Sequence, residues 1–403
     1  MDAESCGLKD EDIASVVNVP GIRSLYDNNE FGPVAWSQFG GLRDLEALMA
    51  FSHLTDQSLR CLPNLTRLES LILRTTITFS ASPDQPRPFS GAALEALKSM
   101  KELRELELES DGLDDDALSK IGKVPGLISL SLNGRFTDDG LADLRDLITL
   151  RRLSLKGNFT DAGLAHLSQL RNLEALSLHS PRVTGVGLNH LSRLPRLKLF
   201  KMSGLKPGLT LNGLENWQSL RALNLVDLGL TDKIILTLPR LDKLKSLSLQ
   251  LARISDHGLT VLQRFPHLEE LDLLLTPVTD RGMESVSQCR NLRKLCLGES
   301  VAVPLITEAG LIKLTQLPQL ESLDLRYIGL SNVDLSKLRI PSLKALNLES
   351  LGREERTGKL STLREVLPNL ADSFETRVTI EAGLCDESRF RSYDIFSNRM
   401  EVD

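Results

Sequence analysis

The chain has 403 residues, more than one globular core usually holds, because such cores stop growing near about 250–300 residues. Hydrophobic residues make up 41% of it and aromatic residues only 4%, so leucine must fill the core. The formal net charge of -6 argues against a nucleic-acid platform, which normally carries a basic stripe. No stretch approaches the roughly 18 consecutive apolar residues of a membrane span.

The N-terminal segment predicts an intracellular protein. Residues 1–20 form an acidic half-repeat or N-terminal cap, and they lack the basic and then apolar regions of a signal peptide. The cysteines are Cys6, Cys61, Cys289, Cys296 and Cys385. Their number is odd and no pair has CxxC spacing, so we expect reduced thiols and a cytoplasmic location.

The string LxxLxL recurs along the chain and sets its organisation. Its middle position falls at residues 25, 48, 71, 106, 130, 153, 176, 200, 223, 247, 271, 295, 323 and 346. Successive positions differ by 23 or 24 residues except at two insertions. The alternating LxL at the end of each string is typical of a short strand, so the sequence predicts about fourteen repeats with one strand each.

A second block, TDxGLxxL, precedes most of these strands, as in residues 137–144, 160–167 and 307–314. Apolar residues three apart indicate one face of a helix. Thr or Ser stands at the N-cap position, where its hydroxyl can accept a hydrogen bond from a backbone N–H. Asp follows in the first turn, where the helix dipole favours negative charge. Each repeat is therefore predicted to be a helix followed by a strand.

Two insertions and the C-terminal segment depart from this period. Residues 76–90 add a proline-rich loop, and residues 298–307 add a shorter one. Long loops on a rigid scaffold often take part in recognition, although solenoids also tolerate insertions freely. Residues 357–370 are predicted to form a last, degenerate helix, and residues 371–403 a C-terminal cap or tail.

These blocks resemble the leucine-rich-repeat proteins of the TDxGL type. The resemblance covers roughly residues 8–370, and it extends to bacterial cytoplasmic repeat proteins and to the repeat region of F-box proteins. It implies an α/β leucine-rich-repeat solenoid over residues 1–370, curved, with parallel strands on the concave face and helices on the convex face. For function it implies protein recognition in general.

No catalytic motif or metal site is recognisable, so we expect no enzyme, no cofactor and no metal. His166 and His190 occupy equivalent helix positions but lack a third ligand. Trp36 and Trp217 stand at core positions of helices, and Cys296 lies between two strand leucines. The segment GREERTGKL at 352–360 has the wrong spacing for a phosphate-binding loop.

The candidate binding surface is the concave sheet face, whose exposed residues flank and split each LxL. The candidates are Glu105, Glu107, Glu109, Asn133, Arg152, Lys156, His179, Lys201, Asn224, Gln250, Asp272 and Arg326. This row is polar, mixed in sign and poor in aromatic residues, so a solvated face without one evolved ligand is the competing interpretation.

The sequence thus predicts a non-catalytic, monomeric scaffold that binds a partner protein, and neither nucleic acid nor membrane. The alternative is a substrate-recognition subunit of a ubiquitin ligase, as in F-box proteins, or a binding fragment of a larger multidomain protein. The first alternative requires an adaptor-binding module before the repeats, which start near residue 8.

Overall fold

The structure is a computed structural model that describes residues 9–27, 31–75, 87–204, 211, 213–226, 229–298, 305–325, 328–329 and 333–348. The chain divides into two compact units, Met1–Val183 and Thr184–Asp403, and each unit is described by itself. The predicted last helix at 357–370 and the predicted cap at 371–403 lie outside the described residues, as does most of the loop predicted at 76–90.

Every predicted LxL string forms a strand, so the fourteen-strand prediction is confirmed. The strands of the first unit are β1 (Ser24–Asp27), β2 (Ala47–Ser52), β3 (Ser70–Thr75), β4 (Glu105–Glu109), β5 (Ser129–Asn133), β6 (Arg152–Lys156) and β7 (Ala175–His179). Those of the second unit are β8 (Leu199–Ser203), β9 (Ala222–Val226), β10 (Ser246–Ser248), β11 (Glu270–Leu274), β12 (Lys294–Gly298), β13 (Ser322–Asp324) and β14 (Ala345–Asn347).

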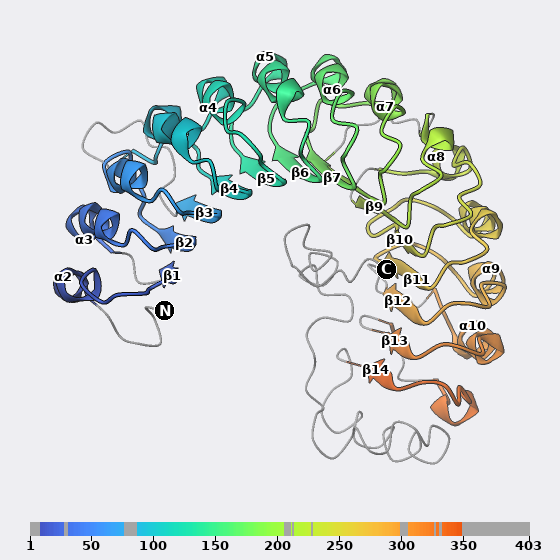
Figure 1. Cartoon of the computed structure of the whole chain (residues 1–403). Helices are drawn as coiled ribbons and strands as arrows, with labels where there is room; N and C mark the ends of the chain where they lie inside the picture. The colour runs from blue at the N-terminus through green and yellow to red at the C-terminus, as the bar shows by residue number, and fades with distance from the viewer. Residues whose placement is uncertain are drawn as a thin grey trace. The chain divides into compact units, whose positions relative to one another are not determined.

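Strands that follow each other in sequence are neighbours in the sheet of each unit, and all their pairings are parallel. The register places the repeat leucines opposite one another, as in Leu130↔Leu153 and Leu247↔Leu271. Within each unit the strands lie on the inner side and the helices on the outer side (Figure 1). The predicted α/β leucine-rich-repeat architecture is therefore confirmed.

The helical segments are shorter and tighter than the sequence predicts. In the first unit they are η1 (Asp10–Asp12), α2 (Ile13–Val16), α3 (Pro33–Gln38), η2 (Phe39–Gly41), η3 (Ser58–Asn64), η4 (Gly91–Ser99), α4 (Asp115–Ile121), α5 (Asp138–Leu141), η5 (Ala142–Asp146) and α6 (Asp161–Leu167). In the second unit they are α7 (Gly185–Leu191), η6 (Leu214–Asn216), α8 (Asp232–Ile235), η7 (Gly258–Arg264), α9 (Gly282–Ser287), α10 (Glu308–Lys313), η8 (Leu314–Gln316) and η9 (Leu335–Lys337).

The segments labelled η are 3₁₀ helices, and the leucine spacing explains them. A 3₁₀ helix has about three residues per turn, so side chains at i and i+3 lie directly above one another. The repeat LxxLxxL has that spacing, whereas a longer α-helix would rotate its third leucine away from the sheet.

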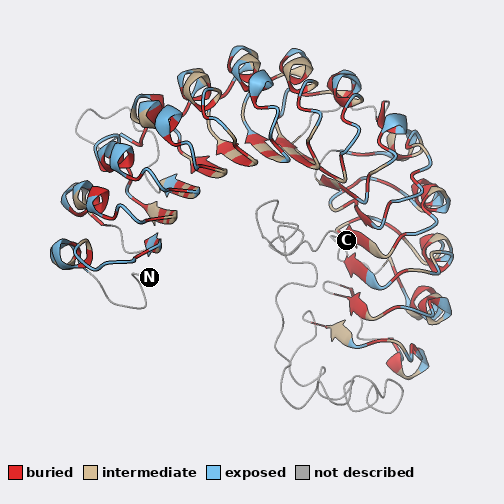
Figure 2. Cartoon of the chain, in the orientation of Figure 1, coloured by how far each residue is buried: buried red, intermediate tan, exposed pale blue. Residues whose placement is uncertain are grey.

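Both the strands and the helical segments contain buried residues (Figure 2), and most of these are leucines. The strand leucines Leu130, Leu153 and Leu247 are fully buried. Trp36 and Trp217 are also buried, which confirms both as core residues. The Trp217 indole N–H donates a hydrogen bond to the Leu191 carbonyl at 3.0 Å, and its ring lies 4.8 Å from that of Phe200.

At six places in the described residues, an aspartate of one helix start is hydrogen-bonded to the Thr or Ser of the next, a contact that we call the Asp–Thr clamp. The Asp138 carboxylate accepts hydrogen bonds from both the backbone N–H and the hydroxyl of Thr160, each 2.6 Å long. The Thr160 hydroxyl in turn accepts a bond from the N–H of Ala162, so the predicted N-cap is confirmed. The same clamp joins Asp56 to Ser90, Asp115 to Thr137, Asp232 to Ser255, Asp256 to Thr279 and Asp280 to Thr307.

The clamp also accounts for the glycine of the TDxGL block. A Cβ atom built on Gly258 would lie 2.5 Å from Oδ1 of Asp232, and one built on Gly282 would lie 2.6 Å from Oδ1 of Asp256. Because no larger residue leaves room for the aspartate of the preceding repeat, glycine is needed here for close approach.

Candidate functional site

On the concave face of the first unit, two columns of side chains run across neighbouring strands. The middle column holds the residues between the two core positions of each strand: Tyr26, Met49, Ile72, Glu107, Ser131, Ser154 and Ser177. The outer column holds the residues after the second core position: Phe51, Arg74, Glu109, Asn133, Lys156 and His179. Both columns point away from the helices, because side chains alternate along a strand.

Four neighbouring side chains on β1–β3 form an apolar patch on this face, namely Tyr26, Met49, Phe51 and Ile72. Tyr26 is 42% exposed, and the other three are half-buried. The register sets Tyr26 beside Met49 and Met49 beside Ile72. The patch ends at β4, where the middle column continues with a glutamate and three serines. This change within one sheet separates the patch from an ordinary solvated sheet face.

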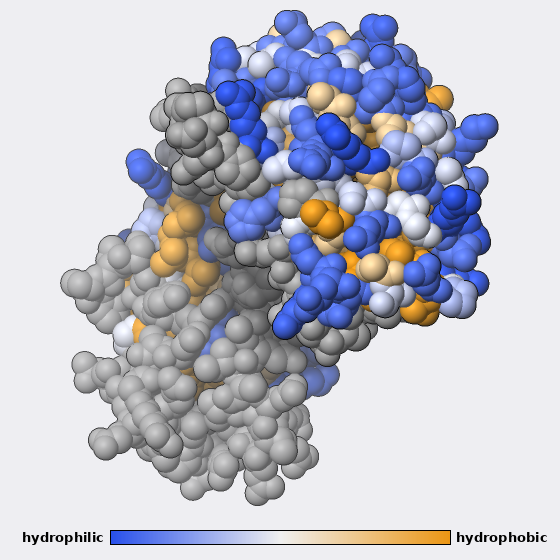
Figure 3. All heavy atoms as spheres, turned by 90° about the vertical axis from the view of Figure 1, so that its left-hand side faces the viewer, coloured by the Kyte–Doolittle hydropathy of each residue, from blue (hydrophilic) through white to orange (hydrophobic). Residues whose placement is uncertain are grey.

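The other exposed apolar residues are more scattered. Val34, Ile148 and Val186 are exposed helix-side residues. The face shown in Figure 3 is mainly hydrophilic, with hydrophobic residues in small groups. Single exposed apolar side chains are normal on protein surfaces, so they carry no functional argument.

A charged cluster adjoins the apolar patch at β3 and β4. The Arg74 guanidinium lies 5.2 Å from the Phe51 ring centroid, a cation–π distance. Its Nε donates to Oε1 of Glu107 at 2.5 Å and lies 3.7 Å from Oε2 of Glu109. Glu105 accepts a bond from the Ser70 hydroxyl at 2.8 Å. Glu107 is buried, so Arg74 neutralises a carboxylate that would otherwise be costly to desolvate.

The remaining first-unit candidates continue the same face. Asn133 donates from its amide to Glu109 at 2.6 Å. Arg152 is half-buried, and its Nε donates to the Ser129 hydroxyl at 3.3 Å. Lys156 is exposed and His179 half-buried. The first unit therefore presents an apolar patch on β1–β3, acidic residues on β4 and basic residues on β6.

In the second unit the candidates differ in exposure. Lys201, Asn224 and Gln250 are half-buried. Asp272 is 1% exposed, and its carboxylate accepts bonds from the Ser248 hydroxyl at 3.1 Å and the Leu274 N–H at 2.9 Å. The structure thus places Asp272 in a buried polar network. Arg326 lies outside the described residues.

The apolar patch was not among the residues selected from the sequence. The β2 segment Ala-Leu-Met-Ala-Phe is apolar at every position, so it gives no alternation from which the solvent side can be identified. The signal in the sequence that could have identified the patch is the repeat spacing, which sets residues of neighbouring strands side by side. Counting 23 residues back from Ile72 reaches Met49, and 23 further back reaches Tyr26.

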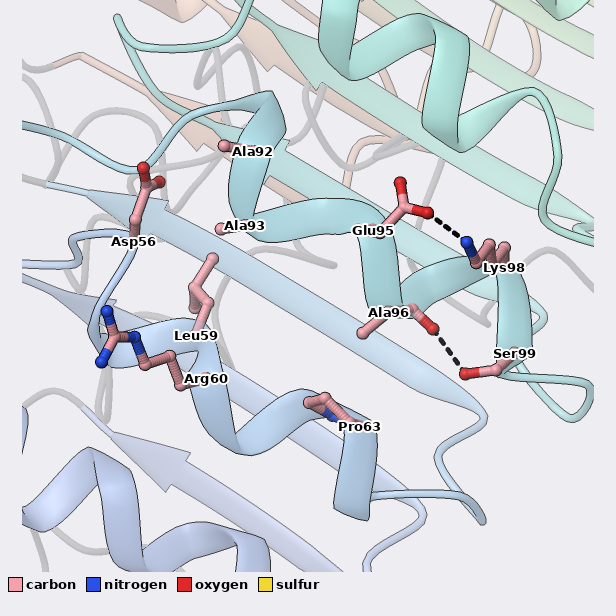
Figure 4. Close-up of a pocket in the computed structure, with 10 residues that line it drawn as sticks. All are labelled: Asp56, Leu59, Arg60, Pro63, Ala92, Ala93, Glu95, Ala96, Lys98 and Ser99. Carbon is pink, nitrogen blue, oxygen red and sulfur yellow. Dashed lines mark hydrogen bonds and ion pairs between the residues drawn. The ribbon is translucent and has the colours of Figure 1, made fainter.

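A groove lies on the helical side of the first unit, between η3 and η4 (Figure 4). This groove has a volume of about 580 Å³, and the small side chains of Ala92, Ala93 and Ala96 line it. Of its charged groups, Glu95 and Lys98 pair with each other, and Asp56 is held in the Asp–Thr clamp. With shallow walls and mostly paired charges, the groove is a weaker candidate than the concave face.

The cysteines correct one prediction. Cys61 and Cys289 are free thiols, and burial raises the pKa of each to about 12. Cys296, which was expected to be reduced, is bonded in a disulfide. The prediction used the odd number of cysteines and the absence of CxxC spacing, and neither of these excludes a disulfide.

Among the described residues, every helix is too short or too polar to span a bilayer. Across those same segments, no three His, Cys, Asp or Glu side chains come together as potential metal ligands.

The fold defines the class as a leucine-rich-repeat protein, and comparison with solved structures supports this. The chain is similar to an internalin from Listeria monocytogenes, with a TM-score of 0.57 and 19% identity over 85% of this chain and 95% of that one. It is also similar to a leucine-rich-repeat protein from Leptospira interrogans, with a TM-score of 0.52 and 17% identity over 86% and 88% of the two chains. No protein-family profile and no curated protein matches the chain.

Identities this low show the fold alone. The TDxGL subtype and the relation to F-box proteins therefore stay predictions from the sequence.

Proposed function

We propose that this chain is a non-catalytic scaffold that binds a partner protein on the concave sheet face of its first unit. The observation that supports this most directly is the apolar patch of Tyr26, Met49, Phe51 and Ile72, which ends at the charged cluster around Arg74. Aromatic and arginine side chains dominate the binding energy of protein interfaces. An apolar group bordered by polar residues is typical of an interaction site.

The remaining first-unit candidates, Glu105, Glu109, Asn133, Arg152, Lys156 and His179, would form the polar surround of this interface. Such surrounds set orientation and specificity more than affinity. No observation on the described residues favours the ubiquitin-ligase alternative, so it is not proposed. A cytoplasmic location and a monomeric state stay predictions.

The test is affinity capture from the native lysate with a double variant, Glu105→Lys with Glu109→Lys. Glu107 is left intact because it is buried against Arg74. The control is Asp139→Lys with Asp143→Lys, which makes the same charge change at exposed helix-side positions of the same unit. Mass spectrometry compares the captured proteins, and thermal melting confirms that all variants are folded.

We expect at least one protein to be retained by the wild type and the control but lost from the Glu105/Glu109 variant. If every specifically captured protein is retained equally by both variants, the concave face of the first unit is not the binding surface.

A further inference from the structure

We infer that the concave face of the first unit binds an extended segment of a partner with a defined order of side chains. That order is an aromatic or long aliphatic residue, a lysine or arginine three residues later, and an acidic residue three residues after that. The inference rests on the proposed function and specifies the chemistry of the partner.

The apolar patch selects the first residue of the segment. It extends across three strands, which at about 4.8 Å per strand spacing makes it about 10 Å wide. Tyr26, Met49 and Ile72 are successive neighbours in register, and Phe51 lies two residues from Met49 on the same strand. A surface of this size fits one large apolar side chain. Methionine within it can adapt its shape to different apolar groups.

The acidic residues of β4 select the second residue. Glu105, Glu107 and Glu109 stand on one strand, and Arg74 is the cation that pairs with Glu107 and lies near Glu109. Three carboxylates and one guanidinium leave a local formal charge of about -2 at neutral pH. The Glu109 side chain is 46% exposed, so a cation from a partner can reach it. Glu105, also half-exposed, widens the same acidic strip.

The basic residues of β6 select the third residue. Arg152 and Lys156 stand two strands beyond β4, and the intervening β5 presents the half-buried Ser131 and Asn133. A carboxylate on the partner would therefore meet opposite charge at β6 and like charge at β4. This order gives the segment a direction across the sheet.

The strand spacing sets the three-residue interval. The centre of the patch, β4 and β6 are each separated by two strands, or about 10 Å. A segment in the extended polyproline II conformation has three residues per turn and advances about 3.1 Å per residue, so its residues i, i+3 and i+6 lie on one face about 9 Å apart. A helical segment advances only about 1.5 Å per residue and would need about seven.

The experiment selects binders from a random 12-residue peptide-display library on the purified full chain. We expect the selected sequences to share an apolar residue at i, Lys or Arg at i+3 and Asp or Glu at i+6. One selected peptide is then synthesised and its affinity measured against Ile72→Asp, Tyr26→Ser and Glu109→Lys. The matched control is Val34→Asp, which makes a similar apolar-to-acidic change on the helix side of the first unit, at a residue that is 69% exposed.

We expect at least tenfold weaker binding to Ile72→Asp and Glu109→Lys, and unchanged binding to Val34→Asp. Tyr26→Ser tests the patch independently, since Tyr26 is exposed and its replacement should not impair folding. A peptide with its basic residue changed to glutamate should bind Glu109→Lys better than it binds the wild type.

Several results would overturn the inference. They are an empty selection, a consensus without the basic residue at i+3, or selected peptides that bind both patch variants as tightly as the wild type. If peptides that are insensitive to the patch variants bind Arg152→Glu more weakly than the wild type, the concave face is still the binding surface. Only the proposed order of side chains in the segment is then wrong. If no concave substitution affects them, the proposed function fails as well.

Discussion

At the scale of single residues, the aspartate of the Asp–Thr clamp links its own helix start to that of the next repeat. Its carboxylate accepts hydrogen bonds from both the backbone N–H and the hydroxyl of the Thr or Ser in the next repeat. The preceding repeat therefore positions this N-cap. The helix dipole alone would place a carboxylate near the N-terminus without requiring this geometry. The conformation of each helix start is therefore coupled to its neighbour.

Replacement of Asp138 by alanine should lower the free energy of unfolding by about 2 kcal/mol, because hydrogen bonds to a charged group contribute about 1.5–3 kcal/mol. Urea denaturation followed by circular dichroism measures this. Asp139→Ala is the matched control, since Asp139 is the next residue and is exposed. The control should change stability by less than about 0.5 kcal/mol. Equal effects of the two substitutions would show that the clamp contributes nothing.

Glycine 258 provides a second test of the clamp. Gly258→Ala should destabilise the wild type, because the added Cβ would lie 2.5 Å from Oδ1 of Asp232. In an Asp232→Ala background that oxygen is absent. In that background Gly258→Ala should lower the free energy of unfolding by less, or even raise it, because alanine is more favourable than glycine in a helix by about 1 kcal/mol. A double-mutant cycle in urea measures the coupling, and strict additivity would refute the steric explanation.

Burial makes the Cys61 thiol unreactive. Its side chain is 2% exposed, and burial raises its pKa to about 12. Only the thiolate reacts readily, and at pH 8 this thiol stays protonated. Iodoacetamide at pH 8 should leave Cys61 unmodified in the folded chain and modify it in 6 M urea (a concentration of about this size unfolds most domains), as read by peptide mass spectrometry. Rapid labelling of the folded chain would contradict this.

At the scale of elements, strands were the most predictable feature. Leu130, Leu153 and Leu247 lie where the repeat period puts them, because the parallel register sets equivalent leucines of neighbouring repeats opposite one another. The clamp was not predictable, because it joins residues one repeat apart and the helix dipole by itself is a sufficient reason for the aspartate. The apolar patch was missed because β2 lacks alternation, and only its register with β3 shows which side chains face outward.

The turns after β10 and β11 contain an unusual backbone conformation. Leu251 and Leu275 have φ angles of 61° and 56°, in the left-handed region that costs a residue other than glycine roughly 1–2 kcal/mol. At the matching position after β8 the chain has Gly204, with φ 79°. Leucines at the same position of two successive repeats thus adopt a backbone conformation for which glycine is better suited.

Leu251→Gly should therefore change the free energy of unfolding by less than about 1 kcal/mol, because relief of the left-handed strain offsets the lost side-chain burial. Leu249→Gly, two residues earlier, should cost at least about 3 kcal/mol, since that side chain is fully buried. Urea denaturation of both variants makes the comparison. A loss above about 2 kcal/mol for Leu251→Gly would mean that its side chain, rather than its backbone, dominates.

At the scale of the whole chain, repeats that contact only their neighbours should respond locally to damage. In solenoids, stability is approximately a sum of repeat terms and nearest-neighbour interface terms. The chain offers one tryptophan reporter in each unit, Trp36 in the first and Trp217 in the second. Both are buried in their own repeats, so the fluorescence of each follows the unfolding of its surroundings.

Leu130→Ala and Leu247→Ala remove equivalent buried leucines from β5 and β10, and each should cost about 2–5 kcal/mol locally. In a Trp217→Phe background, where Trp36 is the sole reporter, Leu130→Ala should lower the urea midpoint more than Leu247→Ala does. In a Trp36→Phe background, Trp217 is the sole reporter and follows the second unit. Leu247→Ala should then lower the urea midpoint more than Leu130→Ala does. Equal midpoint shifts in both backgrounds would show instead that the chain unfolds as one cooperative block, in which case a nearest-neighbour description does not apply to this solenoid.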